Sequence, residues 1–483
     1  MALAMILLPL LLAAVGALIP SNRLRPLVLP VAGLGHLALT AFALLAPGAD
    51  SLSALPGEYP LLGLDAIGKV ILLVVSLVFA ACSIYAVGYL RYRQERPNRV
   101  FIAGLLGFLA GATVVSWSRN MGLTWVAIEA TTLATAPLIY FNNSKRSIEA
   151  TWKFLLVGSV GIALALLGTF FLAYATLVGG GQASLSFDAL CVIGAPVSKP
   201  WLRVAFVLAL VGYGTKMGLA PMHTWKPDAY GEAPGVIGAV FAGGVTSIAF
   251  LAFLRFYIVV SRAGEAAFAS RLLLGMGLFS MAVAGLFMIG QRDFKRMLAY
   301  SSVEHMGILM IGLGLGAPAL FGTMLHVLTN GVTKGVLFLS AGNIHRAYAS
   351  KNIAQVRGAL RRLPLSGGLF LAAFLAITGS PPFGPFVSEF SILNGAFASG
   401  HPLVAAAFLV FLFVVFIGMG RTVLKVTQGR PPEDALTTAY RDGFLTAAPL
   451  VALMAITLFL GIAVPEPLAA LLREAAALVG GQA

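Results

Sequence analysis

The sequence predicts an all-α polytopic membrane protein, and three observations support this prediction. The composition is 59% hydrophobic and 10% charged, with a mean hydropathy of +0.93, which lies outside the range of soluble globular domains. Apolar runs of roughly 18 to 25 residues recur along the chain, each long enough to cross the ~30 Å hydrocarbon core as a helix. The alternating pattern of a membrane barrel is absent, so helices are the only spanning element whose backbone is satisfied in lipid.

In chain order, the apolar runs predict about 14 spanning helices. They are expected at residues 2–20, 26–46, 66–90, 100–117, 121–141, 151–178, 201–222, 234–258, 271–290, 297–316, 318–345, 364–394, 403–425 and 443–463. The first run resembles a secretory signal, but it lacks a basic n-region and continues past any small-residue cleavage site. It is therefore expected to remain as a membrane anchor.

Positive charge is distributed unevenly between the two sides of the predicted bundle. The net charge of +14 reflects 32 Lys and Arg residues. Loops after odd-numbered spans carry 22 of them, Lys226 included, and the opposite side carries 7. Positive loops face the cytoplasm, so a prokaryotic cytoplasmic (inner) membrane location with both termini outside is expected. Dispersal of these charges over short loops argues against a nucleic-acid partner.

Several kinds of cofactor site have no sequence signature in this chain. Cys82 and Cys191 are the only cysteines, and no CxxC, Walker A, GxGxxG-before-helix or HExxH pattern occurs. An iron–sulfur cluster, a nucleotide and a catalytic metal are therefore not expected here. Any redox chemistry that drives the protein is expected in another chain.

Ionisable residues inside predicted spans are the first candidates for function, because burying a charge in lipid is costly. Lys69 lies near the start of its span and is expected to extend its ammonium outward. Glu129 lies too deep for that, although a satisfied structural carboxylate is the alternative. Lys216 precedes Pro221, which opens the helical hydrogen-bond ladder and frees carbonyl groups. A charge at a helix break is typical of midplane ion sites in transporters.

A second group of polar residues follows later in the chain. His326, Asn330 and Lys334 are spaced by four and share one helical face, either as helix-packing contacts or as a proton wire. Glu389 follows a second break. Glu304 and His305 lie two turns into their span, where a structural capping role and a functional role are equally expected. The break at 218–221 has a counterpart at 379–382, 161 residues later, which suggests internal repeats.

These motifs resemble the antiporter-like proton-translocating subunits of complex I, group 4 hydrogenases and Mrp sodium/proton antiporters, over roughly residues 100–425. The strings VAIEATTLATAPL and SSVEHMGI are most similar to the F component of hydrogenase-4 and related formate hydrogenlyase complexes. The other supporting strings are KFLLVGS, TKMGLAPMHTWKPDAYGEAP, DFKRMLAYSSVEHMGI, HVLTNGVTKGVLFLSAGNI and SPPFGPFVSEF.

The resemblance implies two inverted five-helix repeats, spans four to eight and nine to thirteen, with spans seven and twelve broken. The implied organisation is 1–99 for the first three spans, 100–260 and 261–428 for the repeats, and 429–483 for the last span and a short amphipathic segment. It also implies a route on which Glu129 pairs with Lys216, Lys334 continues a polar axis with a family histidine at His326, and Glu389 faces the exit. Accessory candidates are Lys153, His223, Glu304, His305 and Asn330.

One departure from the family concerns span eight. Many complex I relatives carry a lysine midway along it, whereas Thr246 and Ser247 stand here. Whether water or side chains link Lys216 to Lys334 therefore stays open. The long lateral helix of the largest complex I antiporter-like subunit is also not expected, because span fourteen is followed by the short amphipathic segment PEPLAALLREAAALVGG.

The resulting hypothesis is a proton-translocating, non-catalytic subunit of an oxidoreductase complex, with nickel–iron and iron–sulfur centres in partner subunits. Separating Lys216 from Glu129 would leave a lone ammonium in low dielectric and favour release of its proton inward. Moving one charge against ~150 mV costs roughly 3.5 kcal/mol, which an ion pair made and broken in low dielectric can supply. The alternatives are a sodium/proton antiporter or inorganic-carbon uptake subunit, or a purely structural anchor. The sequence leaves open H⁺ against Na⁺, the electron donor and acceptor, and the subunit order.

Overall fold

The computed structural model describes residues 1–45, 51–52, 59–192, 197–430 and 438–481, and these are overwhelmingly helical. Within them, nine helical runs are long and apolar enough to cross a membrane. One of these, Gly235–Ile289, is 55 residues long and is interrupted at Gly264, whose φ is 80°. At 1.5 Å per residue it is long enough to cross twice.

The helices follow the predicted spans closely. They are α1 (Ala2–Leu18), η1 (Arg25–Leu27), α2 (Val28–Leu45), α3 (Ala66–Arg91), α4 (Arg99–Trp117), α5 (Met121–Ile139), η2 (Tyr140–Asn142), α6 (Lys145–Val178), α7 (Phe187–Leu190), α8 (Lys199–Met217), α9 (Trp225–Glu232), α10 (Gly235–Val240), the π-helical η3 (Phe241–Val245), α11 (Thr246–Val260), the π-helical η4 (Ser261–Glu265), α12 (Ala266–Ile289), α13 (Phe294–Leu315), α14 (Ala317–Tyr348), α15 (Ala359–Arg362), α16 (Pro364–Ile377), α17 (Gly384–Ala398), α18 (Pro402–Thr427), α19 (Phe444–Ile462) and α20 (Glu466–Gly480). A short antiparallel pair, β1 (Ser51–Leu52) with β2 (Leu62–Gly63), precedes α3.

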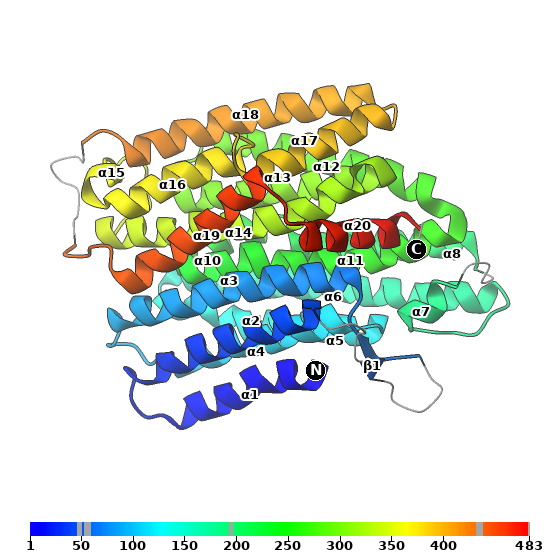
Figure 1. The fold of residues 1–483 in the computed structure, drawn as a ribbon, viewed down its shortest axis with the longest axis horizontal. Helices are drawn as coiled ribbons and strands as arrows, with labels where there is room; N and C mark the ends of the chain where they lie inside the picture. Colours follow the sequence, from blue (N-terminus) through cyan, green and yellow to red (C-terminus); the bar gives the residue numbers. More distant parts are fainter. Residues whose placement is uncertain (46–50, 53–58, 193–196, 431–437, 482–483) are drawn as a thin grey trace.

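The long helices run side by side, with α1 at one edge of the bundle and α18 at the other (Figure 1). Their burial differs with position. The apolar window of α13 is 100% buried and that of α3 is 83% buried, whereas those of α6 and α18 are 39% and 33% buried. The interior helices can therefore carry polar side chains away from lipid, while the outer helices present apolar faces to it.

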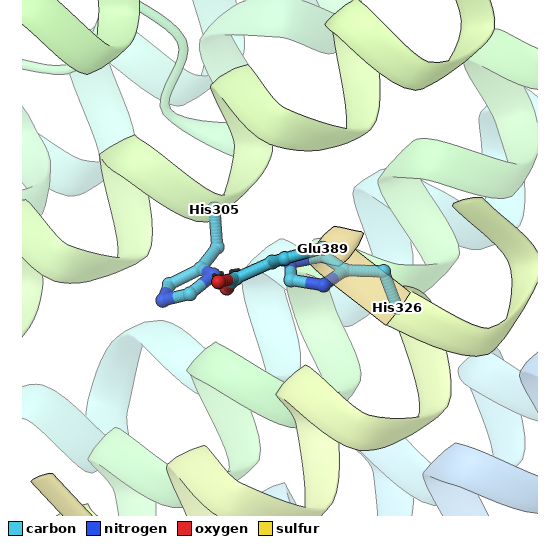
Figure 2. Close-up of side chains that lie close together, drawn as sticks. All are labelled: His305, His326 and Glu389. Carbon is cyan, nitrogen blue, oxygen red and sulfur yellow. Dashed lines mark hydrogen bonds and ion pairs between the residues drawn. The ribbon is translucent and has the colours of Figure 1, made fainter. Parts of the chain in front are cut away.

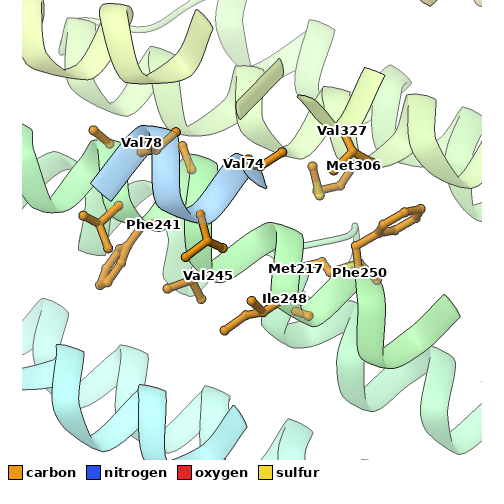
Figure 3. Packing of buried hydrophobic residues seen from close by; sticks show 14 of the residues in the cluster. Val74, Val78, Met217, Phe241, Val245, Ile248, Phe250, Met306 and Val327 are labelled. Atoms are coloured by element: carbon orange, nitrogen blue, oxygen red, sulfur yellow. The ribbon is translucent and has the colours of Figure 1, made fainter. Parts of the chain in front are cut away.

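An apolar cluster fills the space between α3, α11 and α14. Val74 and Val78 of α3 lie there with Ile248 and Phe250 of α11 and Val327 of α14, all buried (Figure 3). β-Branched and aromatic side chains exclude water from this part of the bundle. Polar groups near its centre consequently have to find partners on specific neighbouring helices.

Two helices are broken within the bundle, as predicted. α8 ends at Met217, and α9 begins at Trp225 after Gly218, whose φ is 79°. α16 ends at Ile377, and α17 begins at Gly384. The prolines that follow each break lack an N–H and cannot continue the helix.

Close helix contacts brace the region around the breaks. A Cβ on Gly212 of α8 would lie 2.5 Å from the Ala165 nitrogen of α6, so these two helices approach through small residues. A Cβ on Gly461 of α19 would collide with the Pro382 carbonyl at the second break. Glycine at both positions lets a neighbouring helix support the broken one.

Four predicted spans are not among the nine apolar runs: those of α1, α8, α14 and the second broken helix, α16 with α17. α1 is 17 residues long, and α8 and α14 carry Lys216 and Lys334 with further polar residues, which lower their hydropathy. Each half of the second broken helix is also short. The number of 14 spans stays a prediction.

Candidate functional site: a buried polar axis

Lys216 lies at the end of α8, one residue before the helix ends, and is only 1% exposed. Its Nζ donates a hydrogen bond to Oγ1 of Thr132 on α5. The same ammonium lies 4.8 Å from the ring centroid of Phe154 on α6. The position between α5 and α6 therefore stabilises the ammonium through one hydroxyl and one aromatic face.

Glu129, the expected partner of Lys216, lies on α5 one turn before Thr132. It is close enough to Lys216 for a coulombic interaction, but the two charged groups are not within 4.0 Å of each other. Its Oε1 instead accepts a hydrogen bond from Ser159 at 3.3 Å, and its Oε2 is buried without a partner. The direct contact of Lys216 is Thr132, which lies three residues from Glu129 and so on the same helical face.

Lys334 occupies the middle of α14 and is fully buried. Its Nζ donates to Oγ of Ser301 on α13. Glu304, one turn along α13, and Glu389 of α17 both lie close enough for coulombic interaction with it. Asn330, one turn before Lys334, is buried with Oδ1 unpartnered. The predicted polar stripe therefore faces α13 and α17 inside the protein.

His305, His326 and Glu389 converge from α13, α14 and α17, as Figure 2 shows. Nδ1 of His305 lies 3.0 Å from Nε2 of His326, and Nδ1 of His326 lies 2.9 Å from Oγ of Ser388. Oε1 of Glu389 is 3.9 Å from Nδ1 of His305, and Oε2 of Glu304 is 3.8 Å from its Nε2. The two histidines are within hydrogen-bond distance of each other, and a carboxylate lies just beyond that distance on either side of His305, so the four groups form a closely spaced series of proton acceptors.

The same three side chains offer donor atoms within 4.8 Å of one another. Two imidazole nitrogens and a carboxylate oxygen are ligands that a divalent transition metal accepts. The ammonium of Lys334 interacts with both histidines, and its positive charge opposes a second cation there. The local charge therefore favours proton transfer over metal binding.

Each break carries a glycine in the left-handed region, and a titratable side chain from the following helix covers it. Gly379 has a φ of 70°, and a Cβ there would collide with Oε2 of Glu389. Gly218 has a φ of 79°, and a Cβ there would lie 2.5 Å from Cδ of Lys226. The sequence prediction assigned Lys226 to a loop, but it is fully buried on α9. The broken helix folds back into the protein, and this brings Lys226 inward.

The remaining accessory candidates lie in different settings. Lys153 of α6 is 45% exposed and pairs with Glu149 at 2.6 Å and Asp228 at 2.8 Å, which ties α6 to α9 away from the axis. His223 lies in the first break, 8% exposed, with Nδ1 buried and unpartnered. Of these two, only His223 adjoins the buried axis.

A charge network that the sequence prediction missed closes one end of the bundle. Asp65 caps α3 and pairs with Arg255 of α11 at 2.9 Å and with Arg119, which also pairs with Asp188 of α7. Burial alone would raise the pKa of Asp65, but the guanidinium groups of Arg255 and Arg119 outweigh it and hold the pKa below its ordinary 3.8. The sequence feature that could have indicated this network is Arg255, which lies inside the predicted span 234–258.

Comparison with known proteins agrees with this architecture. The transmembrane family described as NADH:quinone oxidoreductase/Mrp antiporter matches residues 118–418. The chain is 36% identical over 392 residues to a hydrogenase-4 component F homolog of Methylacidiphilum infernorum, covering 79% of this chain and 81% of that protein. It is 30% identical over 420 residues to NADH-quinone oxidoreductase subunit N of Desulforudis audaxviator, covering 83% and 82%.

The fold is also that of a solved structure. A subunit of the Mrp complex from Dietzia sp. DQ12-45-1b superposes with a TM-score of 0.88 at 21% identity, covering 99% of this chain and 97% of that chain. The residues that carried the sequence resemblance lie inside the matched segment. The chain therefore belongs to the NADH:quinone oxidoreductase/Mrp antiporter transmembrane family, as an antiporter-like, multi-pass membrane subunit.

Proposed function

We propose that the chain moves protons across the membrane in a hydrogenase-4-type or complex I-like complex, coupled to redox chemistry in partner subunits. The observation that carries this proposal is that buried ionisable side chains gather at both broken helices, Lys216 at the first and the group from Lys334 to Glu389 at the second. The similarity to the hydrogenase-4 component F homolog supports the type of complex. Nickel–iron and iron–sulfur centres then belong to the partners.

The proposed route begins at Glu129 and Lys216 and ends at Glu389. The ammonium of Lys216 is held by Thr132 and Phe154, so a shift of α8 relative to α5 changes its stabilisation. The proton next reaches Lys334, which is close to Glu304. From there the pair His305 and His326 passes it to Glu389, whose Oε1 is 3.9 Å from Nδ1 of His305 and whose Oε2 lies over Gly379 at the second break. The carboxylate releases it to the exit side.

The proposed architecture comprises 14 spans in a cytoplasmic membrane with both termini outside. Residues 100–260 and 261–428 form inverted repeats, flanked by the first three spans (1–99) and by the last span with its amphipathic segment (429–483). The matching breaks after Met217 and Ile377 support the repeats. Labelling of single cysteines introduced at each terminus, from either side of the membrane, tests the orientation.

The test of the proposed function uses the assembled complex in inverted membrane vesicles, with proton uptake followed by ACMA fluorescence quenching. Lys216→Ala and Glu129→Gln are expected to lower the ratio of proton uptake to electron transfer at least about tenfold, since one carrier is lost. Lys145→Ala, an exposed lysine at the start of α6, is the matched control and is expected to match wild type. Full proton uptake in both pathway variants would refute the proposal.

A sodium/proton antiporter or an inorganic-carbon uptake subunit is the second candidate, because the fold is shared with the Mrp structure. Proton uptake that requires sodium in the same vesicles would favour it. Copurifying chains with nickel–iron or iron–sulfur motifs would favour the redox-coupled complex.

A further inference from the structure

The helix expected to connect Lys216 with Lys334 provides no titratable group at the relevant positions. The hydroxyls of Thr246 and Ser247 donate to carbonyls of their own helix, those of Ala242 and Gly243. Around them, Phe241, Val245 and Ile248 contribute to the apolar cluster (Figure 3). A proton moving between the two lysines therefore needs another carrier.

Lys226 lies where such a carrier is required. Its Nζ donates to the carbonyl of Met217 at 2.5 Å, and Met217 is the neighbour of Lys216 in the chain. The same Nζ is 3.5 Å from the carbonyl of Ser302. Ser301, next to Ser302 on α13, accepts the hydrogen bond from Lys334. One ammonium thus contacts the sequence neighbour of Lys216 and the sequence neighbour of the serine to which Lys334 donates.

The surroundings of Lys226 differ from those of a lysine in an ion pair. Among the described residues, no carboxylate oxygen lies within 4.0 Å of its ammonium. It interacts with backbone carbonyls and with the Tyr230 ring, whose centroid is 5.6 Å away, and it repels Lys334. A buried ammonium without a counter-ion is costly, so the neutral amine competes with it. Repulsion from Lys334 favours protonating one of the two lysines at a time.

Polar atoms around Lys226 are available to extend the connection. The hydroxyls of Tyr230 and Ser302 are buried near one another but outside hydrogen-bond geometry, and Nδ1 of His223 is buried without a partner. Such groups are normally satisfied by ordered water. Of these groups, Ser302 lies on α13, the helix that also carries Ser301, the partner of Lys334.

The second break provides a precedent within the same chain. There, the titratable side chain lying over the left-handed glycine is Glu389, a residue of the proposed route. Lys226 has the same relation to Gly218. We propose that Lys226 carries the proton between Lys216 and Lys334, in place of the group that Thr246 and Ser247 do not provide. This inference rests on the proposed function.

The transfer is balanced as two proton exchanges. An N–H bond of the Lys216 ammonium breaks and one forms on the neutral amine of Lys226, directly or through water. The same exchange then converts Lys226 to the amine and Lys334 to the ammonium. No other reactant is required.

Two variants of Lys226 separate a carrier from a structural contact. Lys226→Gln keeps a donor for the Met217 carbonyl but holds no extra proton, and Lys226→Arg keeps charge and donors but does not release its proton. In vesicles containing the complex, both are expected to lower the ratio of proton uptake to electron transfer at least about tenfold. A structural role would instead be rescued by arginine.

Lys295→Gln is the matched control, because Lys295 is also buried and donates to the Gly231 and Ala233 carbonyls at the end of α9. It is expected to keep the wild-type ratio with lower thermal stability. Wild-type uptake in Lys226→Arg or Lys226→Gln, with Lys216→Ala inactive, would overturn this inference and leave the proposed function standing. Failure of Lys226→Arg to assemble would equally overturn it. Full uptake in Lys216→Ala would instead refute the proposed function.

Discussion

At the scale of single residues, the stabilisation of Lys216 depends on a neutral hydroxyl in direct contact and a carboxylate farther away. Thr132 accepts the hydrogen bond, while Glu129 acts through space. A neutral acceptor holds an ammonium less tightly than an ion pair in the same low dielectric would. This arrangement leaves the proton on Lys216 easier to transfer.

Thr132→Val tests the hydroxyl, since valine preserves the shape of threonine and removes the acceptor. A hydrogen bond to a charged group contributes about 1.5–3 kcal/mol, so we expect proton uptake by ACMA quenching to fall at least about tenfold. Thr131→Val is the control, because the Thr131 hydroxyl donates to the Ile128 carbonyl of its own helix. Equal uptake in the two variants would show that the Thr132 contact is dispensable.

At the scale of elements, the first broken helix satisfies its own free carbonyls with side chains from its second half. Nε1 of Trp225 donates to the Thr215 carbonyl at 2.8 Å, and Lys226 donates to that of Met217. On the other side, Oγ of Ser280 accepts from the Ala220 nitrogen at 3.1 Å. These backbone groups at the break are therefore paired, which favours irregular backbone deep in the bundle.

Gly218→Ala tests the geometry of this break. A left-handed conformation costs alanine about 1–2 kcal/mol, and the added Cβ would also displace Lys226. Gly264→Ala is a matched control, because Gly264 has a φ of 80° and no atom within 4 Å of the added Cβ. We expect both variants to lower the unfolding temperature and Gly218→Ala alone to impair proton uptake. Wild-type proton uptake in Gly218→Ala would show that the position of Lys226 over Gly218 is not needed for transport.

At the scale of the whole molecule, the Asp65 network joins segments far apart in sequence. It connects the start of α3 with α11, α7 and the link between α4 and α5. Because the folded-state pKa of Asp65 is lowered, its ionised form stabilises the fold above pH 3.8. That stabilisation decreases as the pH falls below 3.8, and it is lost once the pH has passed the lowered pKa of Asp65 in the folded state.

Asp65→Asn tests the network. It leaves Arg255, which is 0% exposed, without its paired carboxylate, and breaking a buried pair typically costs about 3–5 kcal/mol. We expect a lower unfolding temperature in detergent at pH 7 and a narrowing gap to wild type as the pH falls below 3.8. Glu466→Gln, which removes an exposed pair with Arg473, is expected to change little. A difference in unfolding temperature between Asp65→Asn and wild type that does not change with pH would contradict the stabilising role of the ionised Asp65 carboxylate.

Much of the fold was predictable because lipid imposes strong constraints on sequence. The apolar run at 66–90 became α3 (Ala66–Arg91), and the breaks near Pro221 and Pro382 fell where proline removes an N–H. Within the site, the spacing of His326, Asn330 and Lys334 predicted one shared face, and the three lie on α14 facing the interior.

The parts that sequence could not predict depend on how broken segments fold back. Lys226 lies among polar residues in the sequence, which predicts a charged residue in a loop. In the structure it lies on α9 and is fully buried. The contact between Lys216 and Thr132 requires knowing the rotation of α5 against α8, and Glu129 is the more conspicuous candidate on that face. Pairing of Asp65 with Arg255 joins residues whose separation along the chain leaves no local signal.

The contact of Gly461 with the Pro382 carbonyl has a practical consequence for trimmed versions of the protein. Gly461 belongs to α19, beyond the matched family segment of residues 118–418. A fragment cut to that segment would therefore keep the second break but lose the surface that backs it. We therefore expect a fragment ending at residue 418 to unfold at a lower temperature than the full chain.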